Sequence, residues 1–172
     1  MMADLRTALL GFDGKAVSYL SETGVRFRTH PSFLSDLVAL ANDPEAHIAD
    51  GATWLVKDHL ETGGAFPHEL VEPLLRSVES RPSWGAILHV AQCVQHLDLS
   101  GVDDPSVFDA MYQHVSHDQP FVRAWALDAI CRLSERVPVR RNQAREALNA
   151  ALQDQAASVQ ARARRIAKDL SV

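Results

Sequence analysis

The sequence is poor in cysteine and in aromatic residues, and it contains no long apolar run. Its two cysteines, Cys93 and Cys131, are too few for a disulfide framework. No segment approaches the roughly 18 consecutive apolar residues that a membrane-spanning helix needs. Charges at Asp4 and Arg6 interrupt the first residues, which therefore lack the apolar core of a secretory signal. These absences predict a soluble, reduced protein of the cytoplasm with no membrane partner.

The motifs of common catalytic sites are missing as well. The chain has no glycine-rich phosphate loop, no nucleophile elbow, no Cys-x-x-Cys pair and no His-Glu-x-x-His helix. We therefore assign no catalytic residue and no cofactor, and we expect a function other than catalysis.

The residues that are present have the proportions of a folded helical domain. Of the 172 residues, 47% are hydrophobic and 23% are charged, while aromatic residues make up only 6%. Alanine and leucine are plentiful, and valine and isoleucine never alternate strictly with polar residues. The composition favours one domain of closely packed helices over a β-sandwich.

The net charge of −5 is distributed unevenly along the chain. Residues 1–120 contain 7 basic and 17 acidic residues, whereas residues 121–172 contain 10 basic and 5 acidic residues. The first part is therefore acidic and the last part basic, a polarity that can contribute to the recognition of a charged partner.

A period of 37 residues runs through most of the chain. Leu37, Leu74, Met111 and Leu148 are each 37 residues apart, and so are Ala41, Val78, Val115 and Leu152. The two series are offset by four residues, which places both on one face of a helix. The period predicts helices at about 31–42, 67–79, 105–117 and 140–153.

A second helix is expected after each of these helices. Its core stripe is clearest at Val122, Ala126, Ala129, Ile130 and Leu133. The same offsets recur at Val159, Ala163, Ile166, Ala167 and Leu170, at Ile48, Ala52, Leu55 and Val56, and at Ala86, Val90, Cys93, Val94 and Leu97. Turns at 42–44, at Arg81-Pro82-Ser83 and at 118–120 separate the two helices of each pair.

The segments DPEAHIADGATWLV, DQPFVRAWALDAICRL and ASVQARARRIAKDL resemble the second helices of HEAT repeats. The third repeat matches best, and Ala49, Ile87 and Gln160 replace its Arg123 in the others. The resemblance implies an all-α, right-handed α-solenoid of about four HEAT-like helix pairs. It also implies one continuous repeat domain, with repeats at about 29–64, 65–102, 103–138 and 139–172. It implies no particular oligomeric state. Before this domain, apolar stripes at Leu5, Leu9 and Phe12 and at Val17 and Leu20 predict an N-terminal helical cap at 1–28.

His89, Cys93 and His96 form the one pattern that is typical of metal ligands. Their spacing of four and three residues would place all three on one stripe of a helix. In the repeat frame, however, Cys93 occupies a core position and the two histidines lie on the helix flank. We therefore predict a packed cysteine with two semi-exposed histidines, and a metal site is the weaker alternative.

In HEAT-like folds the second helices line the concave surface, so their outward positions are the expected partner-binding residues. These positions are Asp50, Trp54, Asp58, Glu61, His89, Ala91, Gln95, His96, Asp128, Arg132, Arg165 and Lys168. An exposed Trp54 would be a binding hot spot, whereas a Trp54 covered by the N-terminal helices would not. Trp84 is expected to staple the entry of its helix and Trp125 to pack against a neighbouring repeat. His114 and His117 are expected at a helix C-terminus, where protonated histidine is favoured.

The favoured function is that of a non-enzymatic scaffold or adaptor, which binds an unidentified protein or peptide along the second-helix face. The first alternative is nucleic-acid binding by the basic C-terminal repeats. Its phosphate contacts would be Arg140, Arg141, Arg145, Arg162, Arg164 and Arg165. The second alternative, a lyase or glycosylase on this scaffold, would need a deep pocket that holds a carboxylate of raised pKa.

Overall fold

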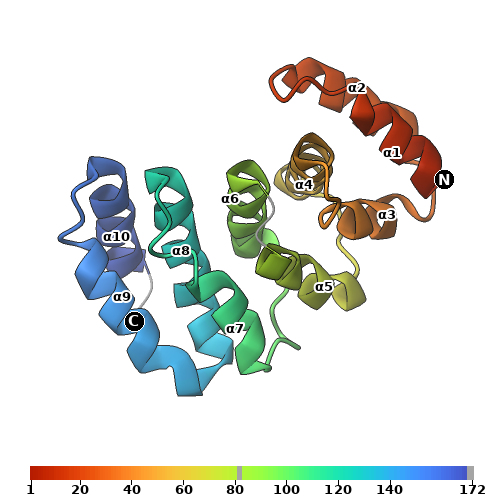
Figure 1. Cartoon of the computed structure of the whole chain (residues 1–172). Helices are drawn as coiled ribbons and strands as arrows, with labels where there is room; N and C mark the ends of the chain where they lie inside the picture. The colour runs from red at the N-terminus through yellow and green to blue at the C-terminus, as the bar shows by residue number, and fades with distance from the viewer. Residues whose placement is uncertain (81–82, 170–172) are drawn as a thin grey trace.

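The computed structural model describes residues 1–80 and 83–169, and within these ranges the chain is all-helical with no strand (Figure 1). The α-helices are α1 (Met2–Leu10), α2 (Val17–Phe27), α3 (Phe33–Leu40), α4 (Ala46–Glu61), α5 (Val71–Arg76), α6 (Trp84–Cys93), α7 (Pro105–Tyr112), α8 (Pro120–Arg136), α9 (Arg141–Ala151) and α10 (Ala157–Asp169). The prediction of an all-α chain is confirmed. The predicted turn at Arg81-Pro82 and the predicted core position Leu170 lie outside the described residues.

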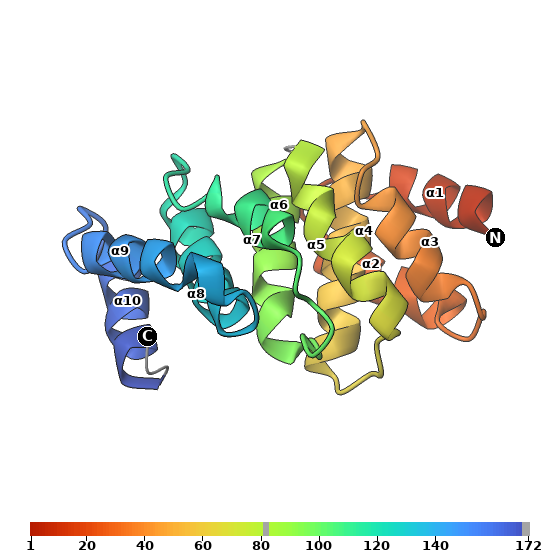
Figure 2. The same cartoon turned by 90° about the horizontal axis from the view of Figure 1, so that it is seen from below.

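The helices α4, α6, α8 and α10, called here the even row, pack side by side in chain order. Each intervening helix lies against this row: α3 packs on α4, α5 on α6, α7 on α8, and α9 on both α8 and α10. The N-terminal helices α1 and α2 pack on α4. Figure 2 shows the consequence, an elongated molecule with α1 and α10 at opposite ends.

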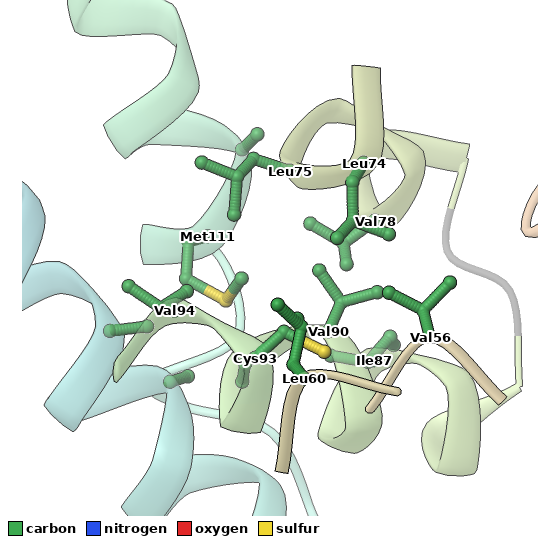
Figure 3. Packing of buried hydrophobic residues seen from close by; sticks show 14 of the residues in the cluster. Val56, Leu60, Leu74, Leu75, Val78, Ile87, Val90, Cys93, Val94 and Met111 are labelled. Carbon is green, nitrogen blue, oxygen red and sulfur yellow. The ribbon is translucent and has the colours of Figure 1, made fainter. Parts of the chain in front are cut away.

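The core follows the 37-residue period of the sequence. Leu37, Leu74 and Met111 are fully buried, and Leu148 is 4% exposed. Figure 3 shows how Met111 of α7 and Leu60 of α4 lie together with Val90 and Cys93 of α6 in one continuous apolar cluster. Each helix pair thus covers apolar side chains of the next pair, as stacked helical units require.

Helix α10 buries only part of its predicted core stripe. The prediction that Ala167 is a core residue is wrong, because Ala167 is exposed. Val159, Ala163 and Ile166 of the same helix face α8 and α9 and are buried, as predicted.

The first helix of each pair is shorter than the period predicts, and at α5 3₁₀ turns take up both ends. Pro67 precedes the short 3₁₀ helix His68–Leu70, and α5 begins directly after it. Pro138 is the first residue of the 3₁₀ helix Pro138–Arg140, which α9 follows. Helix α7 begins as predicted at Pro105, where Asp104 accepts a hydrogen bond from the backbone N–H of Ser106 at 2.9 Å. It ends at Tyr112, five residues before the predicted end at 117.

Candidate functional site

A pocket of about 420 Å³ opens between α2, α4, α6 and the loop that joins α1 to α2. Its lining residues are Phe12, Gly14, Lys15, Val17, Leu20, Asp50, Trp54, Trp84, Gly85, Leu88 and His89. Three of them, Asp50, Trp54 and His89, belong to the partner-binding set that the sequence predicts. The structure therefore brings part of that set together in a concave site, and adds a wall from the N-terminal segment.

The close approach of the N-terminal helices to α4 depends on Gly51. A Cβ atom at this position would lie 2.9 Å from Leu9 Cδ2 and 3.1 Å from Leu20 Cδ2. Both leucines are buried, so they have little room to move aside. The absence of a side chain at Gly51 therefore lets α1 and α2 pack against α4 beside Trp54.

The two tryptophans of the pocket differ in burial. Trp54 of α4 is half-buried and packs against the core, so the N-terminal segment covers it only in part. Trp84 is the first residue of α6 and is 52% exposed. The prediction that Trp84 staples the helix entry is wrong, because its indole lies at the pocket surface and is not packed away. An exposed indole beside a concave site is a common anchor for a binding partner.

Asp50 provides the carboxylate of the pocket. The Ser83 hydroxyl donates a hydrogen bond to Asp50 Oδ1, and Ser83 Oγ itself accepts from the backbone N–H of Ala86 at 3.1 Å, which caps α6. Gly85 makes this arrangement possible, since a Cβ there would lie 2.7 Å from Asp50 Oδ1. Burial raises the pKa of Asp50, although the Ser83 hydrogen bond acts in the opposite direction.

His89 reaches the pocket from α6 and is held by α4. Its Nδ1 lies 3.1 Å from Thr53 Oγ1, and the Thr53 hydroxyl also lies 2.8 Å from the carbonyl oxygen of Ala49. Burial lowers the pKa of His89 to about 4, with a further contribution from Lys57. The imidazole is therefore neutral at pH 7 and serves as a polar contact between the two helices.

His89, Cys93 and His96, whose spacing is typical of metal ligands, lie in three different environments. Cys93 is fully buried in the apolar core (Figure 3), and burial raises the pKa of its thiol. His89 contacts Thr53, and His96 is exposed on the 3₁₀ turn Val94–His96. The prediction of a packed cysteine is confirmed. Within residues 1–80 and 83–169, no group of three His, Cys, Asp or Glu side chains is placed to hold a metal ion.

The remaining predicted binding residues lie outside the pocket. Glu61 is exposed and pairs with Lys57 of the same helix at 2.9 Å, while Asp58 is half-buried. Gln95 and Lys168 are exposed. Arg165 is also exposed, with its Nε 3.4 Å from Asp169. These residues are accessible but the structure does not gather them into one site.

Asp128 and Ala91 are not outward-facing, which corrects the sequence prediction. Ala91 is 2% exposed and Asp128 is 3% exposed. Asp128 is buried because two arginines enclose it: Arg132 Nε at 2.6 Å from its Oδ1, and Arg162 Nη1 at 3.3 Å from its Oδ2. The Arg162 guanidinium also lies over the Trp125 ring, 3.6 Å from its centroid. The prediction that Trp125 packs against a neighbouring repeat is confirmed by this contact between α8 and α10.

His114 also departs from its expected role. It lies beyond the end of α7, is 3% exposed, and its Nε2 is 3.1 Å from the carbonyl oxygen of Val78. It therefore links two helix pairs and does not cap a helix end from solvent. His117 is half-buried nearby, and its Nδ1 accepts a hydrogen bond from the backbone N–H of Gln119.

The arginines of the predicted phosphate-binding set fall into two groups. Arg140 pairs with Asp109, and Arg162 is engaged by Asp128 and Trp125. Arg141, Arg145, Arg164 and Arg165 are exposed. The exposed group is divided between α9 and α10, which belong to different sides of the helix stack.

Comparison of the chain with protein-family models, with curated proteins and with solved structures gives no match. The resemblance to HEAT repeats thus rests on the quoted residues. Among the described residues, no helix is both long enough and apolar enough to cross a membrane.

Proposed function

We propose that this protein is a non-enzymatic binding module, an α-solenoid of four HEAT-like helix pairs with an N-terminal helical cap. Its partner is a protein or peptide that lies along the even row. The observation that carries this proposal is the open pocket that displays Trp54 and Trp84 beside a carboxylate. The stacking of α4, α6, α8 and α10 supports the solenoid architecture, in which repeated helices present one extended binding surface.

The pocket has the features of an anchor site for a partner side chain. Most of its lining side chains are apolar, and its charged or ionisable groups are few: Asp50 on α4, His89 on α6 and Lys15 in the loop between α1 and α2. Tryptophan is enriched among residues that dominate binding energy, and Trp84 is exposed in the free protein at 52%. A partner that covers this indole would gain apolar burial without a rearrangement of the fold.

Affinity capture from a lysate of the native host, with and without nuclease, tests this proposal. The wild type should retain a protein partner that resists nuclease, and Trp84→Ala should lose it, because Trp84 contributes to the pocket but little to the core. Val139→Ala removes an exposed apolar side chain on the 3₁₀ helix Pro138–Arg140, outside the even row, so it is the matched control and should retain the partner. Capture of nucleic acid alone, lost with Arg164→Ala/Arg165→Ala and kept with Trp84→Ala, would contradict the proposal and support the nucleic-acid alternative.

A second candidate is catalysis in the same pocket, which one observation favours. Burial raises the pKa of Asp50, as the enzyme hypothesis requires of a pocket carboxylate. Against this, Asp50 accepts a hydrogen bond from Ser83, the N-cap residue of α6, and so contributes to the structure of the helix start. Release of a base from alkylated duplex DNA by the wild type, abolished in Asp50→Asn, would support the enzyme and displace the binding module.

A further inference from the structure

The pocket between α2, α4 and α6 combines two indole rings with a carboxylate, Asp50, that forms no ion pair within residues 1–80 and 83–169. Several other aspartates each pair with an arginine from another part of the chain: Asp43 with Arg6, Asp104 with Arg76, Asp109 with Arg140, Asp128 with Arg162 and Asp154 with Arg123. Asp50 accepts a hydrogen bond from the Ser83 hydroxyl, and the charge of His47 opposes the rise in its pKa that burial causes, but the part of the chain that the structure describes gives it no ion pair. A half-buried carboxylate of this kind is electrostatically complementary to a cation.

At the contact between α8 and α10, an indole and a carboxylate of the same molecule do bind a guanidinium. There the guanidinium of Arg162 lies 3.6 Å from the Trp125 centroid and 3.3 Å from a carboxylate oxygen of Asp128. The face of the indole attracts the cation, and the carboxylate accepts a hydrogen bond from the same guanidinium. The α4–α6 pocket offers the indoles and the carboxylate without the guanidinium.

We propose that the α4–α6 pocket binds an arginine side chain of the partner, with its guanidinium between the indoles and Asp50. This inference rests on the proposed binding function and names the group that is recognised. Val17, Leu20 and Leu88 line the pocket and would contact the aliphatic part of the side chain. Arginine fits better than lysine because its planar group can stack on an indole and donate paired hydrogen bonds at the same time.

The charges around the pocket agree with this assignment. Residues 1–120, which supply every lining residue, carry 17 acidic and 7 basic side chains, so the surrounding field attracts a cation. Lys15 lines the pocket, but its side chain is exposed and forms no ion pair with Asp50. Its ammonium group can remain in solvent while a guanidinium occupies the site.

Titration with N-acetyl-L-arginine amide, observed through the indole N–H signals of the three tryptophans by NMR, tests the inference. Trp54 and Trp84 should shift saturably, and Trp125, whose ring face is already occupied by Arg162, should not. N-acetyl-L-citrulline amide has a neutral urea in place of the guanidinium and should bind at least about tenfold more weakly. Asp50→Asn should reduce arginine binding to the citrulline level, because the amide can keep the Ser83 contact but carries no charge.

Two further variants control for loss of structure. Trp84→Ala should weaken arginine binding with an unchanged amide spectrum elsewhere, since Trp84 is exposed. Asp58→Asn changes the charge of α4 outside the pocket and should bind arginine as the wild type does. Equal binding of arginine and citrulline, or an unaffected Asp50→Asn, would overturn the arginine assignment. In that case the affinity capture distinguishes the two proposals. If Trp84→Ala still loses the captured protein, the proposed binding function is retained and only the arginine assignment is wrong. If Trp84→Ala keeps the captured protein, both proposals are wrong.

Discussion

The guanidinium of Arg162 on α10 lies 3.6 Å from the ring centroid of Trp125 on α8. One Nη atom of the same side chain lies 3.3 Å from Asp128, which is only 3% exposed. A buried carboxylate needs such partners because an unpaired charge in the interior is costly. This contact therefore joins the last helix pair to the rest of the stack.

Arg162→Ala should destabilise the protein by about 2 kcal/mol, because it removes the contact with Trp125 and leaves Asp128 with Arg132 alone. Urea unfolding followed by circular dichroism measures the change. Arg165→Ala on the exposed side of the same helix should change stability by less than about 0.5 kcal/mol. Equal effects of the two variants would mean that the buried contact contributes nothing specific.

Gly51→Leu should destabilise the protein by about 2 kcal/mol or more, because the new side chain collides with Leu9 and Leu20. It should also detach α1 and α2 from α4 and raise the solvent accessibility of Trp54, which fluorescence quenching can follow in a Trp84→Phe/Trp125→Phe background. Ala39→Leu on the exposed side of α3 is the control for an added leucine. A Gly51→Leu protein with wild-type stability would show that the N-terminal helices tolerate a wider spacing.

Stability should fall as the pH drops from about 6.5 to about 4, because of His89. The unfolded chain protonates this imidazole near its ordinary pKa of about 6.5, whereas burial, with help from Lys57, lowers the folded pKa to about 4. In this window the unfolded state binds more protons, and the full shift corresponds to about 3 kcal/mol. Asp50 acts in the opposite direction, because its pKa is raised and protonation favours the folded state.

Comparison with His89→Asn isolates the histidine contribution, because asparagine can keep the Thr53 hydrogen bond but does not titrate. Free energies of unfolding at several pH values from 4 to 7 should converge for the two proteins at low pH and diverge at high pH. Parallel curves would show that His89 titrates alike in the folded and unfolded states.

Cys93 should be inert toward thiol reagents in the native protein. It is fully buried, and burial raises its pKa, so the reactive thiolate is not available. Cys131, which is also buried, has its pKa raised to about 12. Ellman's reagent should label neither cysteine before unfolding and both afterwards. Rapid labelling of Cys93 in the native state, or suppression of labelling by zinc, would revive the metal-site alternative.

The sequence predicted the helices and the core better than it predicted the site. The 37-residue period located Cys93 in the core, and the structure confirms this. The same pattern placed Asp128 on the surface, where the structure does not place it. Helical periodicity reports which face of a helix is apolar, but an arginine from another helix can bury a carboxylate on the polar face. No spacing within α8 indicates that Arg162 of α10 does so.

The sequence alone predicts that this chain is helical, that its helices come in pairs, and most of the apolar side chains that form the core. Those properties follow from local propensity and from a repeated spacing, and both are contained in short segments. The pocket was decided only by the tertiary structure. Lys15, Asp50 and Trp84 come from three segments far apart in the chain, and Gly51 and Gly85 allow these segments to approach. Side chains form a site through such long-range packing, which no local pattern encodes.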